Sequence, residues 1–445
     1  MPLAVQRAAR PPVALYVHVP FCVALCPYCD FVVYAGRAAR GPAARVDAFL
    51  AALAAELELR ADDLDTAFGV PGEHRPPLQS VYLGGGTPSL LDARPVAALL
   101  DAVRRRFGLS GDAEVTLEAN PGPDERGDLA GFAAAGVTRL SLGAQSLDAG
   151  ELRRIGRRHS PGDVLAALRE ARRAGFRSVS VDLLYDIPGQ REASWRSTLE
   201  AVLDAGVEHV SAYALTLDDP DVEGLTGPLG DHLPTRPGAR AWRERARPEQ
   251  DQDRAADLYL AADALLGAGG LCWYELSNWA VPGAESRHNL AYWRREPYEA
   301  LGPGAHAFDG GTRRRWNAAR LDGYLAALSP GPGIEVGPTQ LPDGRARPAR
   351  GHGRPSDGRA RAAAGPALPP GGEERLDDHA LAVEEAILGL RLREGIGPEV
   401  AARPAVADAL AWGRGYGLVE DVEGGRVRLS LRGRLLANEV LGRIA

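Results

Sequence analysis

Lysine is absent from this chain of 445 residues, so all 52 of its fixed cationic side chains are arginines. Aspartate and glutamate outnumber them at 59, which gives a net charge of 52 − 59 = −7 at pH 7. Proteins that bind nucleic acid through its phosphates normally carry a basic excess. The charge balance therefore argues against nucleic acid as a general partner.

Long apolar runs are missing as well. No stretch approaches the roughly 18 residues that a membrane-spanning helix needs, which leaves only peripheral contact with a membrane open. The N-terminal stretch MPLAVQRAARPPVALYVHV has too short an apolar part for a signal peptide and no small-residue cleavage site. The four cysteines are too few for a disulfide scaffold in a chain this long. We expect a reducing, cytoplasmic compartment.

The chain does contain a repeat of short β-branched segments and Ala/Leu/Arg-rich segments, the latter with apolar residues at i, i+3 and i+4. This alternation predicts an α/β fold in which parallel strands are joined by helices. About six units favour a barrel or partial barrel over an open doubly wound sheet, but periodicity does not decide between them. The strand candidates are 13–19, 80–86, 114–120, 139–145, 178–184 and 209–215.

Chemically distinctive segments share one position relative to these strands. Cys22–Cys29 follows the first strand, Gly84–Thr87 ends the second, and Glu118–Asn120 ends the third. Gln145 ends the fourth strand, and Asp182 lies near the end of the fifth. In β/α barrels the loops after the strands build the functional site. We therefore expect one site at the carboxyl ends of the strands.

Composition divides the chain into four parts. Residues 1–250 carry the repeat, and residues 251–328 continue it with a helix and an aromatic-rich block. Residues 329–378 are rich in Gly, Pro and Arg, which is typical of a disordered linker or surface loop. The tail, 379–445, combines helical spacing with a hairpin-like turn and a last helix. It predicts a small winged-helix-like domain.

Three of the four cysteines form a C-x3-C-x2-C frame at Cys22, Cys26 and Cys29. A zinc site would need a fourth ligand, and only the distant Cys272 or a recruited His18 could supply it. A four-iron, four-sulfur cluster suits the frame better. Three thiolates on one loop reach three irons and leave the fourth open to a small molecule.

The frame resembles that of the radical S-adenosylmethionine (SAM) superfamily. The resemblance implies that SAM chelates the open iron through its amine and carboxylate. It also implies that an electron from the cluster cleaves SAM to a 5′-deoxyadenosyl radical, so that the protein mainly positions the cofactor and excludes water. The glycines of YLGGGTPSLL stand where this superfamily places a glycine-rich segment against the methionyl amine. Glycine alone would indicate no more than a tight turn.

Longer motifs narrow the resemblance. YVHVPFCVALCPYCDF, LEANPG, RLSLGAQSLDAGELRRIGRRH, VDLLYDIPGQ and RHNLAYW occur in an order similar to that of the oxygen-independent coproporphyrinogen III oxidase-like family. Within that family the HemW-type heme chaperones are most similar. The resemblance implies a partial (β/α)6 TIM-like barrel with a [4Fe-4S] cluster on the three cysteines. The implied SAM contacts are Tyr16, Tyr28, Gly85, Gly86, Thr87, Glu118, Gln145, Arg157, Asp182, Ala214 and His306.

Two features favour the chaperone branch over the oxidase branch. Where oxidases carry a fourth cysteine, this chain has Phe31, and it enters its first predicted strand by about Val13 without the long N-terminal segment of oxidases. RHNLAYW also matches a motif that the family associates with heme binding. The implied heme residues are His288, Asn289, Tyr292 and Trp293, with His288 as an iron ligand. The alternative for His288 is a capping or core histidine among packed aromatic rings.

The resemblance implies that heme is a cargo, passed to a respiratory heme protein that the sequence does not identify. It also implies a low-potential electron donor, equally unidentified. The alternative function is that of a coproporphyrinogen III dehydrogenase, which would oxidatively decarboxylate two propionates to vinyl groups. A third possibility is a zinc-stabilised barrel without radical chemistry.

Overall fold

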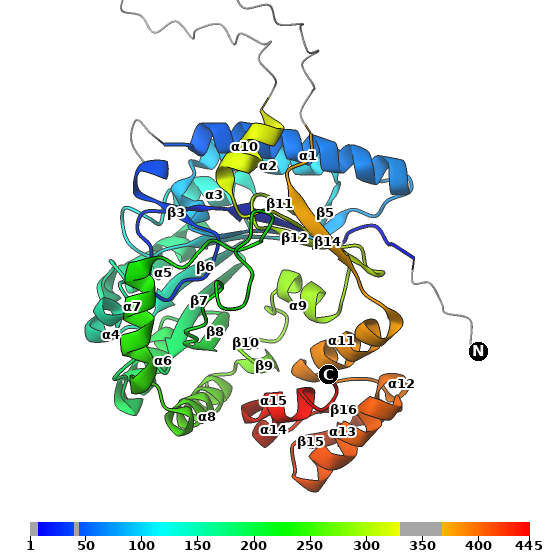
Figure 1. Ribbon diagram of the computed structural model, residues 1–445. Coiled ribbons are helices and arrows are strands. Elements are labelled where there is room, and N and C mark those ends of the chain that lie inside the picture. Colours follow the sequence, from blue (N-terminus) through cyan, green and yellow to red (C-terminus); the bar gives the residue numbers. More distant parts are fainter. Residues whose placement is uncertain (1–7, 40–43, 330–366) are drawn as a thin grey trace, which may run out of the picture.

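The computed structural model describes residues 8–39, 44–329 and 367–445 (Figure 1). Its largest feature in these residues is a mixed sheet with the strand order β14-β13-β12-β11-β1-β4-β5-β6-β7-β8-β10-β9. The strands from β11 to β8 run parallel, and antiparallel strands extend both margins. The predicted α/β class with a mainly parallel sheet is confirmed.

The six central strands follow one another in chain order, and each coincides with a predicted strand. The largest difference in bounds is in the third, which begins at Leu109 instead of residue 114. These strands are β1 (Ala14–Val19), β4 (Leu78–Gly85), β5 (Leu109–Ala119), β6 (Arg139–Gln145), β7 (Ser178–Tyr185) and β8 (His209–Ala214). The connecting helices are α1 (Val46–Phe68), α2 (Ala93–Arg106), α3 (Leu129–Ala135), α4 (Ala149–Arg154), α5 (Pro161–Ala174) and α6 (Glu192–Asp204).

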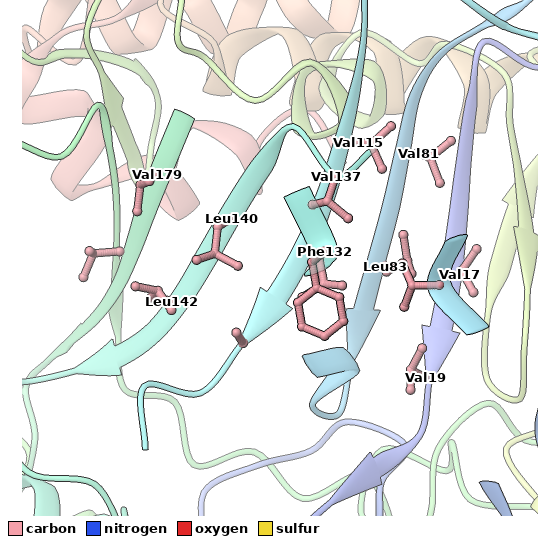
Figure 2. Packing of buried hydrophobic residues seen from close by; sticks show 14 of the residues in the cluster. Val17, Val19, Val81, Leu83, Val115, Phe132, Val137, Leu140, Leu142 and Val179 are labelled. Atoms are coloured by element: carbon pink, nitrogen blue, oxygen red, sulfur yellow. The ribbon is translucent and has the colours of Figure 1, made fainter. Parts of the chain in front are cut away.

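Side chains on these strands alternate between a packed face and a polar face. Val81 and Leu83 of β4, with Leu140 and Leu142 of β6, belong to the main core, where Phe132 of α3 packs beside them (Figure 2). Parallel strands usually read as apolar on both faces, because helices cover both. Here the intervening positions are largely polar, as in RLSLGAQ and SVSVDLLY. The alternation leaves one face of the sheet available for a site.

Residues 251–328 extend the same sheet at both margins. β9 (Cys272–Glu275) and β10 (Asn278–Ala280) pair beyond β8, after α7 (Pro237–Ala246) and α8 (Gln252–Ala268). On the other margin β11 (Tyr298–Leu301) pairs in parallel with β1, and β12 (His306–Phe308) and β13 (Arg313–Asn317) follow. Between these strand groups, α9 (Arg287–Trp293) lies on the opposite side of the sheet from α1 (Figure 1). α10 (Leu321–Leu328) packs against α1.

The predicted linker at 329–378 is too long at its C-terminal end. Most of it, residues 330–366, lies outside the described residues. However, β14 (Gly371–Arg375) pairs with β13 as the outermost strand. Arg313 bonds Glu373 at 2.7 Å, and Arg314 bonds Glu374 at 3.3 Å. Cross-strand charge pairs of this kind support an edge strand that hydrophobicity alone does not reveal.

The C-terminal residues have their own small core, made mainly of aliphatic side chains from 386–444. Three helices precede an antiparallel pair of strands, and two short helices end the chain. The elements are α11 (Asp378–Arg391), α12 (Pro398–Ala401), α13 (Pro404–Gly415), β15 (Val419–Val422), β16 (Arg426–Leu429), α14 (Leu431–Leu435) and α15 (Ala437–Leu441). None of the helices in the described residues is both long and apolar enough to cross a membrane.

Candidate functional site

The three predicted cluster cysteines follow β1, with Cys22 at the end of the short strand β2 (Phe21–Cys22) and the other two on the cysteine loop after it. All three face one cavity of about 610 Å³, here called the cluster cavity. Arg243 of α7 holds this loop from behind. Its guanidinium donates to the carbonyl oxygens of Pro27 at 3.1 Å, Tyr28 at 3.2 Å and Cys29 at 3.1 Å. An arginine fork that spans successive carbonyls fixes the loop backbone and therefore the directions of the thiols.

The thiols themselves are free and partly buried. Burial raises the pKa of Cys22 to about 11 and also raises the pKa of Cys29. Thiolates in such surroundings need a positive group beside them, and a metal cluster supplies one. Within the described ranges, no three His, Cys, Asp or Glu side chains are arranged to hold a metal ion. Three soft donors on one loop suit an iron–sulfur cluster, in which each thiolate binds a different iron.

The glycine-rich segment closes tightly over this loop. Gly85 has φ = 105°, a conformation that favours glycine, and a Cβ on Gly86 would lie 2.6 Å from the carbonyl oxygen of Phe21. The N–H of Gly86 bonds Val19 O at 2.9 Å, and that of Thr87 bonds Phe21 O at 2.7 Å. Packing therefore requires the glycines, and a contact from Gly86 or Thr87 to a cofactor amine would come from their carbonyl oxygens.

Two carboxylates, one on β5 and one on β7, face the same cavity from either side of β6. Glu118 accepts hydrogen bonds from Tyr82 Oη at 2.8 Å and Gly85 N at 2.9 Å. Burial raises the pKa of Glu118 to about 7, and the nearby Asp182 adds to this shift. Asp182 accepts a hydrogen bond from Ser141 Oγ at 3.2 Å, and burial raises its pKa too. Two poorly solvated carboxyl groups here can bind hydroxyl groups of a ligand.

Arg157 joins the cysteine loop to the ends of β5 and β6. One guanidinium nitrogen donates to Gly143 O at 2.7 Å and to the side-chain oxygen of Asn120. The other donates to Cys26 Sγ at 3.6 Å. Its Nε is buried and has no hydrogen-bond partner within the described residues. Arg157 therefore combines a full charge with an unused donor, which suits an anionic ligand group.

Gln145 has an unusual backbone conformation for its residue type. Its φ is 66°, in the left-handed region that non-glycine residues seldom adopt. It ends β6 and lines the cluster cavity. Uncommon backbone conformations of this kind gather at functional sites, where the surrounding structure maintains them.

The structure brings most of the predicted residues together and separates two of them. The cysteines and every predicted SAM residue except His306 line the cluster cavity, as do His288, Asn289 and Tyr292. His306 and Trp293 line a second cavity of about 640 Å³. This second cavity, here called the aromatic cavity, has walls that include Tyr292, Trp293, Tyr298, His306, Phe308 and Trp316.

His288 lies where its alternative interpretation placed it, among packed aromatic rings. It is 1% exposed, and both ring nitrogens are hydrogen bonded, Nδ1 to Ser80 Oγ at 3.0 Å and Nε2 to Tyr292 Oη at 2.8 Å. Burial lowers its pKa to about 3. Iron coordination by His288 would require one of these two bonds to break.

Sequence reasoning looked only at strand ends and missed the polar face below them. Residues on that face that also line the cluster cavity are Tyr82, Arg139, Ser141, His209 and Ser211. Arg139 is 3% exposed, and its Nε has no hydrogen-bond partner among the described side chains and backbone. The signal was present as polar residues at every second position of otherwise apolar parallel strands. No sequence pattern indicated the role of Arg243, which lies on α7 and holds the cysteine loop.

Comparisons with known proteins agree with this arrangement. Residues 16–202 match the model of the Radical SAM superfamily. The chain is 38% identical over 437 residues to the heme chaperone HemW of Mycobacterium tuberculosis, covering 97% of this chain and 94% of that protein. It is 36% identical over 296 residues to the heme chaperone HemW of Escherichia coli, covering 66% of this chain and 70% of that protein.

A solved structure has a similar fold over nearly the whole chain. The coproporphyrinogen III oxidase HemN from Escherichia coli, a radical SAM enzyme, superposes with a TM-score of 0.71. The match covers 99% of this chain and 92% of that chain at 21% sequence identity. At this identity the likeness concerns the fold and does not extend to the reaction.

Proposed function

This chain belongs to the HemW family of radical SAM proteins, and from that premise we propose that it is a heme chaperone. It would hold a [4Fe-4S] cluster and SAM in the cluster cavity, bind heme as cargo and deliver it to a respiratory heme protein. One observation carries the proposal. The cluster cavity gathers Cys22, Cys26 and Cys29 with every predicted SAM residue except His306.

We assign the residues of the cluster cavity as follows. The three thiolates would hold three irons, and the loop clamp from Arg243 would keep them in place. Arg157 would bind the methionyl carboxylate of SAM, and carbonyl oxygens of the Gly85–Thr87 segment would accept from its amine. Glu118 and Asp182 would bind the ribose hydroxyls. When bound, the cluster supplies one-electron reduction, and these residues orient the cofactor and exclude water.

Two finer statements about the fold are also proposals. We infer that the six central strands form the partial (β/α)6 barrel of this superfamily and that 379–445 is a winged-helix-like domain. The second is supported by three helices followed by an antiparallel ribbon, with an isolated bridge from Ile396 to Val427. A cytoplasmic location suits an oxygen-sensitive cluster with free thiol ligands.

Heme titration of the anaerobically reconstituted protein tests the proposal. We expect a saturable Soret change at stoichiometric heme, followed by transfer of the heme to an apo respiratory heme protein. If one equivalent of heme causes no change in the Soret band, the heme-chaperone assignment is wrong. Parallel incubation with coproporphyrinogen III, SAM and a low-potential reductant should give no vinyl product. Formation of that product would establish the dehydrogenase instead.

SAM affinity is expected to rise with pH through about 7, the raised pKa of Glu118. Above that pH its side chain is mostly the ionised carboxylate, which is a stronger acceptor for ribose hydroxyls than the protonated acid. The same shift means that ionising Glu118 lowers the stability of the folded protein as the pH rises from the ordinary glutamate range toward 7. Calorimetric SAM titrations between pH 5.5 and 8.5 measure this rise in SAM affinity. Glu118→Gln should flatten it, and an unchanged pH profile in that variant would contradict the role.

A further inference from the structure

The aromatic cavity lies beside the cluster cavity but has different walls. It is formed by α9, β11, β12, β13 and β14, by α11, and by the loop at 224–231. Charged side chains also line it, namely Asp231, Arg295, Arg314, Glu374 and Glu384. Figure 1 shows α9 and α11 on the same side of the sheet. Its volume of about 640 Å³ lies within the range of about 300–1,000 Å³ that is common for small-molecule and cofactor sites.

The rings of this cavity contact one another in two groups. Tyr292 and Tyr298 meet edge to face with centroids 4.6 Å apart, and Tyr298 lies 6.4 Å from Phe308. On the neighbouring strands His306 pairs with Trp316 across the sheet, and the two rings stack at 5.9 Å. Trp293 adds a buried indole N–H that has no hydrogen-bond partner in the described part of the chain. A flat aromatic ligand that carries hydrogen-bond acceptors suits such walls.

His306 has the arrangement of a metal-binding histidine. Its Nε2 lies 2.8 Å from Asp231 Oδ2, and its side chain is 43% exposed. The contact with Asp231 does not use the other ring nitrogen, Nδ1. Histidines that bind metals usually donate their second ring N–H to a carboxylate, which orients the ring.

The comparison with His288 decides between the two histidines. His288 is 1% exposed and uses both of its ring nitrogens within the protein. Iron coordination there would break a buried hydrogen bond. His306 can coordinate iron through Nδ1 while Nε2 keeps its contact with Asp231.

A small cavity of about 320 Å³ shares lining residues with both larger ones. It shares Tyr16 and Phe31 with the cluster cavity and Asp231 and His306 with the aromatic cavity. Tyr292 lines all three. A ligand in the aromatic cavity would therefore lie next to the cluster site without competing for the SAM residues.

We propose that the aromatic cavity is the heme site of this protein and that His306, oriented by Asp231, is the iron ligand. The proposal rests on the heme-chaperone function proposed above and specifies where that function takes place. It assigns His288 a structural role and removes His306 from the SAM contacts.

Ferric heme titration of the cluster-loaded full chain, followed by difference absorbance and electron paramagnetic resonance (EPR), tests the ligand. His306→Ala is expected to lose the histidine-ligated heme spectrum and to weaken heme binding about tenfold or more. Added imidazole should restore the spectrum, since it replaces the missing nitrogen. His288→Phe, the matched histidine control, should keep the wild-type heme spectrum. Cluster absorbance before heme addition reports whether each variant is folded.

A second variant tests the cavity without touching the ligand. Leu225→Trp would fill the aromatic cavity from the loop side, and we expect about tenfold weaker heme binding with an unchanged cluster spectrum. If wild type binds heme while His306→Ala keeps its spectrum and affinity, the ligand assignment is wrong and the proposed function stands. If Leu225→Trp binds heme as tightly as the wild type, heme does not bind in the aromatic cavity. If wild type binds no heme, the proposed function itself fails.

Discussion

Alanine at Cys22, Cys26 or Cys29 is expected to abolish the iron–sulfur absorbance of the anaerobically reconstituted protein. Each thiol lines the cluster cavity. A cluster held by only three protein ligands depends on every one of them, because its fourth iron has no protein ligand. Bound iron and sulfide should fall from about four per chain to near zero. Iron and sulfide assays with visible spectra measure the loss.

Cys272 provides the matched control, because it is also free and partly buried but lies on β9, away from the cysteine loop. Cys272→Ala should keep the wild-type spectrum and iron content. Full cluster content in any one of the three loop variants would show that the predicted ligand set is wrong. Thermal unfolding of the apo forms should separate ligand loss from misfolding.

Arg157→Leu is expected to weaken SAM binding by about 30-fold or more, the usual consequence of removing one partner from a buried charged hydrogen bond. The guanidinium carries the charge that the methionyl carboxylate requires, and its Nε is unused within the described residues. Arg157→Lys should recover only part of the affinity, because a single ammonium cannot replace the planar fork. Calorimetric titration with SAM provides the measurement.

The ligand 5′-methylthioadenosine distinguishes carboxylate binding from a general loss of structure. It keeps the adenosine and the sulfur of SAM but lacks the amino-acid group. Its affinity should be nearly the same in wild type and in Arg157→Leu. Equal weakening of both ligands would mean that Arg157 mainly supports the backbone near Asn120 and Gly143. That result would contradict its assigned role.

The parts of this protein that depend on local sequence could be predicted. The period-2 and period-3.6 patterns located all six central strands, and the shared position after the strands gathered Cys22, Gly86 and Gln145 into one cavity. The topology of a parallel sheet explains this success, because the carboxyl ends of all its strands meet at one edge. Strands predicted from local patterns were therefore enough to predict which segments share the site.

The remaining features depend on contacts between distant segments. Arg243 reaches the cysteine loop from more than 200 residues away in the chain, and no local motif marks it. His306 pairs with Asp231, which lies on a loop that sequence reasoning left without structure. The segment of β14 falls in the predicted linker because 329–378 has few aliphatic and many Gly, Pro and Arg residues, whereas pairing with the arginines of β13 makes it a strand. Tertiary pairing overrides local preference in each case.

EPR of the chemically reduced, cluster-loaded protein, recorded with and without SAM, tests most directly whether a cluster with an open iron lies within reach of the SAM residues. Cluster formation with a SAM-dependent change in the g-values, absent in Arg157→Leu at the same SAM concentration, is the predicted result. A normal cluster signal that saturating SAM leaves identical in the wild-type protein would contradict the account.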